Sequence, residues 1–159
     1  MSAAHPLPRR VPGYSNGELR RGGRRHAAVF SSSSHAAAGA RRWARQVTGF
    51  PPAEASMLEL VTSELVSNAL QHTASGRPGG FFTIKIAFMT PSCLRLEVTD
   101  GGPRVTDKCS FPDWGGGPVD SDHGRGLAIV GEVSRRTGVL GVVGGPLTVW
   151  AILDRADLR

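Results

Sequence analysis

Apolar positions along the chain change from a helical period to an alternating one, and this change predicts the elements. Between Ala53 and about His72, apolar residues recur at spacings of three and four, which predicts one long amphipathic helix. A shorter helix is expected over Ala36–Val47, after the potential capping serines 31–34 and before Gly49. The apolar face of the long helix consists of Leu58, Val61, Leu65, Val66 and Ala69.

The second half of the chain alternates instead, as strands do. Phe81–Met89 and Leu94–Thr99 alternate apolar and polar residues on either side of a short turn, which predicts an antiparallel hairpin. We expect a third helix over Leu127–Arg136 and closing strands at Val139–Val143 and Leu147–Leu153. This order predicts an α+β fold, a two-layer α/β sandwich with helices on one face of a mostly antiparallel, mixed sheet.

Positive charge is concentrated near the N-terminus. Residues 1–45 carry nine arginines and one acid, whereas the rest of the 159-residue chain has a net charge of −2. Residues 1–26 are also rich in Pro and Gly, so we expect a basic, disordered arm ahead of a domain at 27–159. Such an arm could bind nucleic acid, but a solvated tail is the favoured interpretation and we do not expect nucleic acid as a partner.

Several classes of protein are excluded by what the sequence lacks. No apolar run reaches the length of a membrane span, and no apolar stretch follows the basic N-terminal residues, so we expect neither a membrane segment nor a secretory signal. Cys93 and Cys109 lack the clustered spacing of a zinc site or a disulfide framework. These features predict a cytoplasmic protein.

Two polar residues stand at the margin of the apolar stripe of the long helix. Glu64 and Asn68 are four residues apart, so their side chains are neighbours on the helix surface. A carboxamide oxygen suits hydrated Mg²⁺, and a carboxylate can order or deprotonate a nucleophile. Taken alone, the pair is more typical of an ordinary surface helix.

Two glycine-rich segments are further candidates for ligand contacts. Asp100-Gly101-Gly102-Pro103 follows a predicted strand, where an ionised Asp could accept a hydrogen bond from an exocyclic amine such as that of adenine. Gly124-Arg125-Gly126-Leu127 opens the third helix, whose exposed N–H groups and arginine suit a phosphate. Each segment alone would also fit an ordinary turn.

The three segments in this order resemble the N, G1 and G2 boxes of the GHKL ATPase superfamily, over about residues 28–153. Arg104 departs from the commoner G1 pattern, which has a further glycine there. The chain looks most like the anti-sigma-factor serine/threonine kinases and their stand-alone actinobacterial-type relatives, also in its closing Thr148-Val149-Trp150. A complete sensor histidine kinase is not expected, because about sixty residues precede the N box and His35 lacks the usual acidic neighbour.

The resemblance implies ATP and Mg²⁺ as cofactors and a role for each matching residue. Glu64 would activate the attacking hydroxyl, and Asn68 would hold Mg²⁺ against the phosphates. Asp100 would accept the adenine amine, with Gly102 leaving room for the ring. The remaining nucleotide contacts would come from His72, Gly124, Arg125, Gly126, Leu127 and Thr148.

By the same resemblance, the protein would phosphorylate an anti-sigma-factor antagonist and sequester a sigma factor, and a homodimer would be in keeping with its relatives. The alternative is a catalytically silent, nucleotide-binding adaptor that regulates transcription through protein–protein contacts. Phosphoryl transfer separates the two, because the adaptor would respond to ATP without transferring phosphate.

Overall fold

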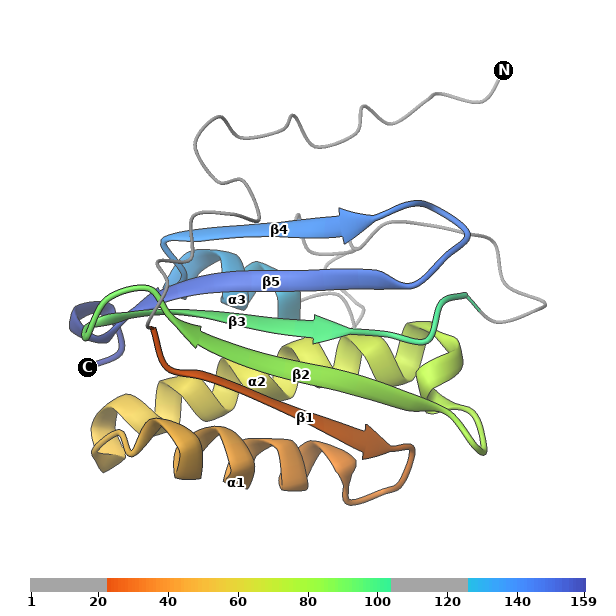
Figure 1. Ribbon diagram of the computed structural model, residues 1–159, viewed down its shortest axis with the longest axis horizontal. Coiled ribbons are helices and arrows are strands. Elements are labelled where there is room, and N and C mark those ends of the chain that lie inside the picture. The colour runs from red at the N-terminus through yellow and green to blue at the C-terminus, as the bar shows by residue number, and fades with distance from the viewer. Residues whose placement is uncertain (1–22, 104–125) are drawn as a thin grey trace.

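Three helices lie on one face of a five-stranded sheet (Figure 1). The computed structural model of the chain describes residues 23–103 and 126–159. Within them the helices are α1 (Ala36–Thr48), α2 (Pro52–His72) and α3 (Gly126–Val133), with short 3-10 turns η1 (Ala74–Gly76) and η2 (Arg155–Asp157). The strands are β1 (Arg25–Ser31), β2 (Phe81–Phe88), β3 (Cys93–Thr99), β4 (Arg136–Gly141) and β5 (Leu147–Asp154).

The strand order is β1-β2-β3-β5-β4, and every neighbouring pair among the described strands is antiparallel. The predicted α+β sandwich with helices on one face is therefore confirmed. The sheet is antiparallel throughout these strands, so the prediction of a mixed sheet was too broad. Helix α2 contacts both α1 and α3, so the helices form a single layer beneath the sheet.

The core lies between the sheet and α2. Alternate residues of β2, such as Phe82, Ile84 and Ile86, are fully buried, as strands with one covered face require. From the other side, α2 buries Leu58 and Leu65 of its predicted apolar face. The periodicity seen in the sequence therefore identified the two surfaces that pack together.

Strand β1 is the element that the sequence pattern did not predict. Its side chains alternate between half-buried and exposed, because β1 is an edge strand paired with β2 alone. Arg25 and His26, assigned by sequence to the basic arm, belong to this strand. Residues 1–22 of the predicted arm lie outside the described residues.

The boundary between α3 and β4 also differs from the prediction. The helix expected to reach Arg136 ends at Val133, and Arg136 is already paired with Ile152 of β5. Backbone pairing with β5 begins at Arg135, whose N–H donates to the Ile152 carbonyl. At its other end β4 stops at Gly141, which has a positive φ, and the two following valines form the turn to β5.

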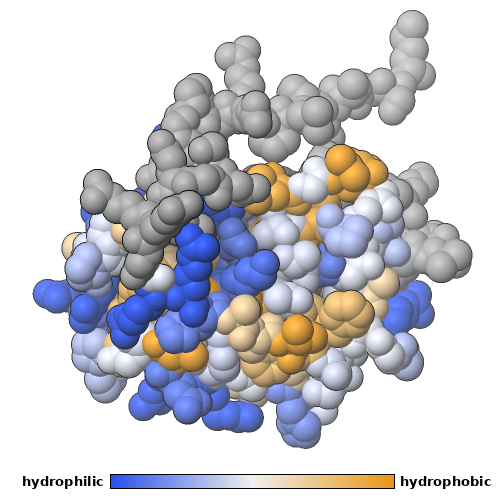
Figure 2. Space-filling view, in the orientation of Figure 1, coloured by the Kyte–Doolittle hydropathy of each residue, from blue (hydrophilic) through white to orange (hydrophobic). Residues whose placement is uncertain are grey.

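Exposed apolar side chains gather at that turn. Leu140, Val142 and Val143 are 39, 71 and 46% exposed. Figure 2 shows an orange patch at upper right, on the side where Figure 1 draws the turn between β4 and β5. No helix in the described parts of the chain is long and apolar enough to span a membrane.

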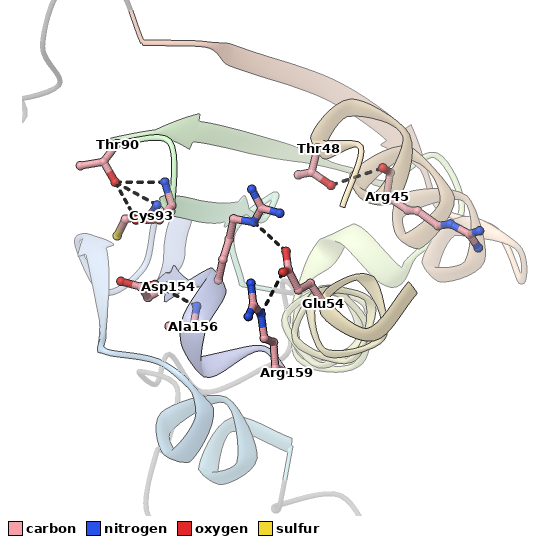
Figure 3. Close-up of polar contacts among 10 residues, drawn as sticks. Arg45, Thr48, Glu54, Thr90, Cys93, Asp154, Ala156 and Arg159 are labelled. Atoms are coloured by element: carbon pink, nitrogen blue, oxygen red, sulfur yellow. Dashed lines mark hydrogen bonds and ion pairs between the residues drawn. The ribbon is translucent and has the colours of Figure 1, made fainter. Parts of the chain in front are cut away.

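The C-terminus is fastened to the start of α2 through a buried acid. Glu54 is 2% exposed, and its carboxylate binds Arg155 at 2.6 Å and Arg159 at 3.2 Å. Figure 3 shows Arg159 and the neighbouring arginine directed at the two carboxylate oxygens. The Arg155 guanidinium, which also lies over the Phe50 ring, holds the pKa of Glu54 below its ordinary value.

Candidate functional site

Asp100 lies at the end of β3, on the side of the sheet that faces the helices. It continues the alternation of the buried residues Leu96 and Val98 and is itself 8% exposed. Its Oδ1 accepts the N–H of Gly102 at 2.7 Å and the N–H of Leu147 at 3.1 Å. Among the described residues, no hydrogen bond reaches Oδ2, so this oxygen retains acceptor capacity for a ligand amine.

The surroundings of the Asp100 carboxyl group suit binding of a ligand by hydrogen bonds more than by an ion pair. Burial raises the pKa of Asp100 above 3.8, and the N–H groups of Gly102 and Leu147 offset part of that shift. Among the described residues no salt bridge engages Asp100, so backbone donors are its hydrogen-bond partners there. An exocyclic amine would add a third N–H donor to this set.

The turn formed by Asp100, Gly101 and Gly102, called the Asp100 turn below, requires glycine at its third position. Gly102 has φ +90°, a left-handed conformation that side chains rarely adopt. A Cβ there would also lie 3.5 Å from the backbone of Gly145 and Pro146 in the β4–β5 turn. Gly102 therefore lets the chain pass close to the start of β5.

The short η1 turn that follows α2 is hydrogen-bonded to the Asp100 turn. The Ala74 N–H donates to the Gly102 carbonyl at 2.8 Å, and the Gly101 N–H donates to Ser75 Oγ at 2.8 Å. Ser75 Oγ in turn donates to the Phe81 carbonyl at 2.8 Å. The N-box helix and the Asp100 turn are thus connected through η1.

Glu64 lies against the first residue of α3. A Cβ built on Gly126 would overlap the Glu64 carboxylate, so only glycine leaves the space that this carboxylate occupies. The structure therefore brings together the N-box acid and the glycine of the G2 box, 62 positions apart in the sequence. The first turn of a helix presents unpaired N–H groups, so the carboxylate stands where anionic ligand groups would be favoured.

The other predicted residues on these helices are placed as follows. Asn68 is half-buried one turn beyond Glu64 on α2, and His72 is the last, exposed residue of that helix. The Leu127 side chain is 7% exposed within the core, which leaves its backbone N–H for any phosphate contact. Gly124 and Arg125 lie outside the described residues.

Thr148 does not join the other candidates. Its hydroxyl lies 2.7 Å from that of Thr99, its register partner, on the face of the sheet opposite the helices. The adjacent Val149 and Val98 occupy the core side instead. The predicted nucleotide contact through Thr148 is therefore unsupported by its position, because strand alternation directs its side chain away from Asp100.

Sequence reasoning did not single out Ser75. The Thr73-Ala-Ser75 pattern after a helix is a recognisable local cap, since Thr73 Oγ1 accepts the Ser75 N–H at 3.1 Å. Nothing local, however, could pair Ser75 with Gly101.

These residues fit a nucleotide. Asp100 Oδ2, to which no described residue donates a hydrogen bond, suits an adenine amine, and the helix start at Gly126 beside Glu64 suits phosphate groups. The described residues contain no cluster of three His, Cys, Asp or Glu side chains. Mg²⁺ does not require such a cluster, because it is commonly held by one protein oxygen together with phosphates and water. Asn68 offers that oxygen.

The fold is an antiparallel sheet covered by helices on one face, with Asp100 at a strand end and Glu64 and Asn68 on α2. This arrangement is that of an ATP-binding domain of the GHKL class. More narrowly, residues 30–145 match the family described as histidine kinase-like ATPase domains, and the chain belongs to that family. ATP, typically with Mg²⁺, is the ligand of these domains.

One similar protein is the blue-light-activated histidine kinase 2 of Erythrobacter litoralis (strain HTCC2594). It is 34% identical over 65 residues, which make up 41% of this chain and 19% of that kinase. The aligned part therefore covers about a fifth of the length of that relative.

Proposed function

We propose that this protein is a serine/threonine kinase that transfers the γ-phosphoryl group of ATP to an anti-sigma-factor antagonist and sequesters a sigma factor. The observation that supports a transferase best is the contact between the Glu64 carboxylate and Gly126 at the start of α3. In this proposal the carboxylate accepts a proton next to phosphate groups bound by the N–H groups at the start of α3. The serine/threonine specificity and the two protein partners rest on the resemblance of the motifs.

Glu64 is the proposed proton acceptor. A hydroxyl oxygen of the protein substrate would bond to the γ-phosphorus as the bond to ADP breaks, and the hydroxyl proton would pass to the Glu64 carboxylate. Bound Mg²⁺-ATP supplies the phosphoryl group and screens its charge. Asn68 would hold the cation, and the N–H groups at the start of α3 would orient the phosphates.

Asp100 is the proposed base-recognition residue. Its Oδ2 would accept the adenine amine while the N–H groups of Gly102 and Leu147 keep Oδ1 in place. Since all three groups belong to folded backbone at the end of β3 and the start of β5, the acceptor is already oriented before the nucleotide arrives. Such preorganisation raises affinity because less freedom is lost on binding.

The first experiment measures equilibrium binding of ATP with Mg²⁺ to the wild type, Asp100→Asn and Asn68→Ala. Both substitutions should weaken binding, Asp100→Asn also without Mg²⁺ and Asn68→Ala chiefly with it. Asp157→Asn is the matched control, because Asp157 lies beyond the other end of β5 and should leave binding unchanged. Absence of ATP binding by folded wild-type protein would refute the proposal.

The second experiment measures transfer of radiolabelled γ-phosphate to antagonist proteins. Glu64→Ala should abolish transfer while keeping most of the ATP affinity. Normal transfer by that variant would remove Glu64 from the proposed role. If ATP binds and changes partner affinity but no antagonist is phosphorylated, the adaptor function replaces the kinase function.

A further inference from the structure

Ser75 is buried and is hydrogen-bonded to Thr73, to Phe81 at the start of β2 and to Gly101 in the Asp100 turn. It lies in η1, just after α2, and is fully buried. Thr73 fixes it locally: Thr73 Oγ1 donates to the Ala69 carbonyl at 2.7 Å and accepts the Ser75 N–H at 3.1 Å. The orientation of Ser75 is therefore determined by the last turn of the N-box helix.

The Ser75 hydroxyl both accepts and donates a hydrogen bond, to segments 26 and 6 positions further along the chain. It accepts the Gly101 N–H and donates to the Phe81 carbonyl, both at 2.8 Å. The parallel bond from the Ala74 N–H to the Gly102 carbonyl holds the other side of the turn. Because Gly101 and Gly102 have no side chains, η1 holds the turn through these contacts with its backbone.

Asp100 depends on this turn for its geometry. Its Oδ1 accepts the Gly102 N–H at 2.7 Å, so a shift of Gly102 moves or frees the carboxylate. If the Ser75 hydroxyl is absent, the Gly101 N–H and the Phe81 carbonyl both lose a buried partner, which favours rearrangement of the turn.

We propose that Ser75 is a positioning residue for recognition of the nucleotide base, holding the Asp100 turn so that Asp100 Oδ2 meets the exocyclic amine of adenine. This inference rests on the proposed function, because it assigns Asp100 to the base. It adds that the selectivity for adenine depends on a hydroxyl that does not touch the nucleotide.

The test compares the affinities for ATP and inosine triphosphate, whose base carries a carbonyl in place of the amine. Wild type should prefer ATP. Ser75→Ala should lower ATP affinity by roughly tenfold, about the effect of losing one part-buried hydrogen bond, and should reduce the ATP/inosine triphosphate ratio several-fold. Thr62→Val is the matched control: it removes another buried hydroxyl, one in the middle of α2 that is bonded to the Leu58 carbonyl of the same helix.

The ratio of the affinities for ATP and inosine triphosphate distinguishes a positioning role of Ser75 from a purely structural one. If Ser75→Ala lowers both affinities equally, with the same ratio as wild type and as Thr62→Val, Ser75 is only structural and the inference is overturned. If Ser75→Ala does not fold, Thr73→Val and Thr73→Ser replace it: only the valine variant should lose the ratio, because serine keeps the hydroxyl that orients Ser75. An unchanged ratio in Thr73→Val would then overturn the inference.

Asp100→Asn distinguishes failure of this inference from failure of the proposed function. If Asp100→Asn abolishes the nucleotide preference and Ser75→Ala does not change it, only the role of Ser75 is refuted. If wild type shows no preference, or Asp100→Asn retains it, base recognition by Asp100 fails and the role of Ser75 fails with it.

Discussion

Alanine at Gly126 provides a sharp test of how Glu64 is held. A Cβ at this position would overlap the Glu64 carboxylate, which is the far end of a flexible side chain, so the glutamate must rotate away. An off-rotamer side chain costs about 0.5–1.5 kcal/mol. Replacing a helical glycine by alanine contributes about 0.4–1 kcal/mol in the opposite direction, because the unfolded chain loses freedom.

The two effects nearly cancel, so we expect the stability of Gly126→Ala to stay within about 1 kcal/mol of wild type, a change of only a few degrees in Tm. Phosphoryl transfer should nevertheless fall by a factor of about 100 or more, since a positioned general base contributes about 10²–10⁴ to the rate. Thermal unfolding and the rate of transfer from labelled ATP measure the two quantities on the same preparation.

Gly131 provides the control for this substitution. It lies in the same helix, and a Cβ built there meets no atom within 4 Å, so Gly131→Ala should keep both stability and transfer. In the Gly126→Ala background, Glu64→Asp shortens the displaced side chain and should restore part of the rate. Wild-type transfer by Gly126→Ala, or equal loss of activity in Gly131→Ala, would refute the reasoning.

Three further outcomes follow from the contacts described above. Glu54→Gln should lower Tm by several degrees, and it should remove a loss of stability that the wild type shows on acidification. The sign follows from the lowered pKa of Glu54: the ionised acid stabilises the fold above pH 4.5, and this is lost as the pH falls through the folded-state pKa, as thermal melts between pH 3 and 6 would show. ATP binding by wild type should weaken as the pH falls through the pKa of Asp100, which burial raises above 3.8, whereas binding by Asp100→Asn should lack this step in a calorimetric pH series. The same raised pKa means that Asp100 makes the unliganded fold less stable as the pH rises through that window. Thr148→Val should leave ATP affinity unchanged, because its hydroxyl pairs with Thr99 on the far face; a tenfold loss would contradict that placement.

The predicted site was recoverable from sequence to the extent that its residues are close neighbours in the chain. Glu64 and Asn68 share a helix face by their spacing alone, and Asp100 follows a strand whose alternation is plain. The proximity of Glu64 to Gly126 followed only from the resemblance to a known order of motifs, since no local pattern spans the intervening residues.

The sequence by itself determined the first two helices and the apolar face of the longer one, the central hairpin, the layer architecture and the order of the three motifs. Each of these depends on periods of 3.6 or two residues, or on glycine and acid placed a few positions apart, which local chemistry specifies. The tertiary structure alone decided that residues 25–31 form an edge strand, that pairing with β5 ends α3 early, and that Thr148 faces away from Asp100. It alone joined Ser75 to Gly101, because strand register and contacts between distant segments depend on how the faces pack and are not encoded in any single segment.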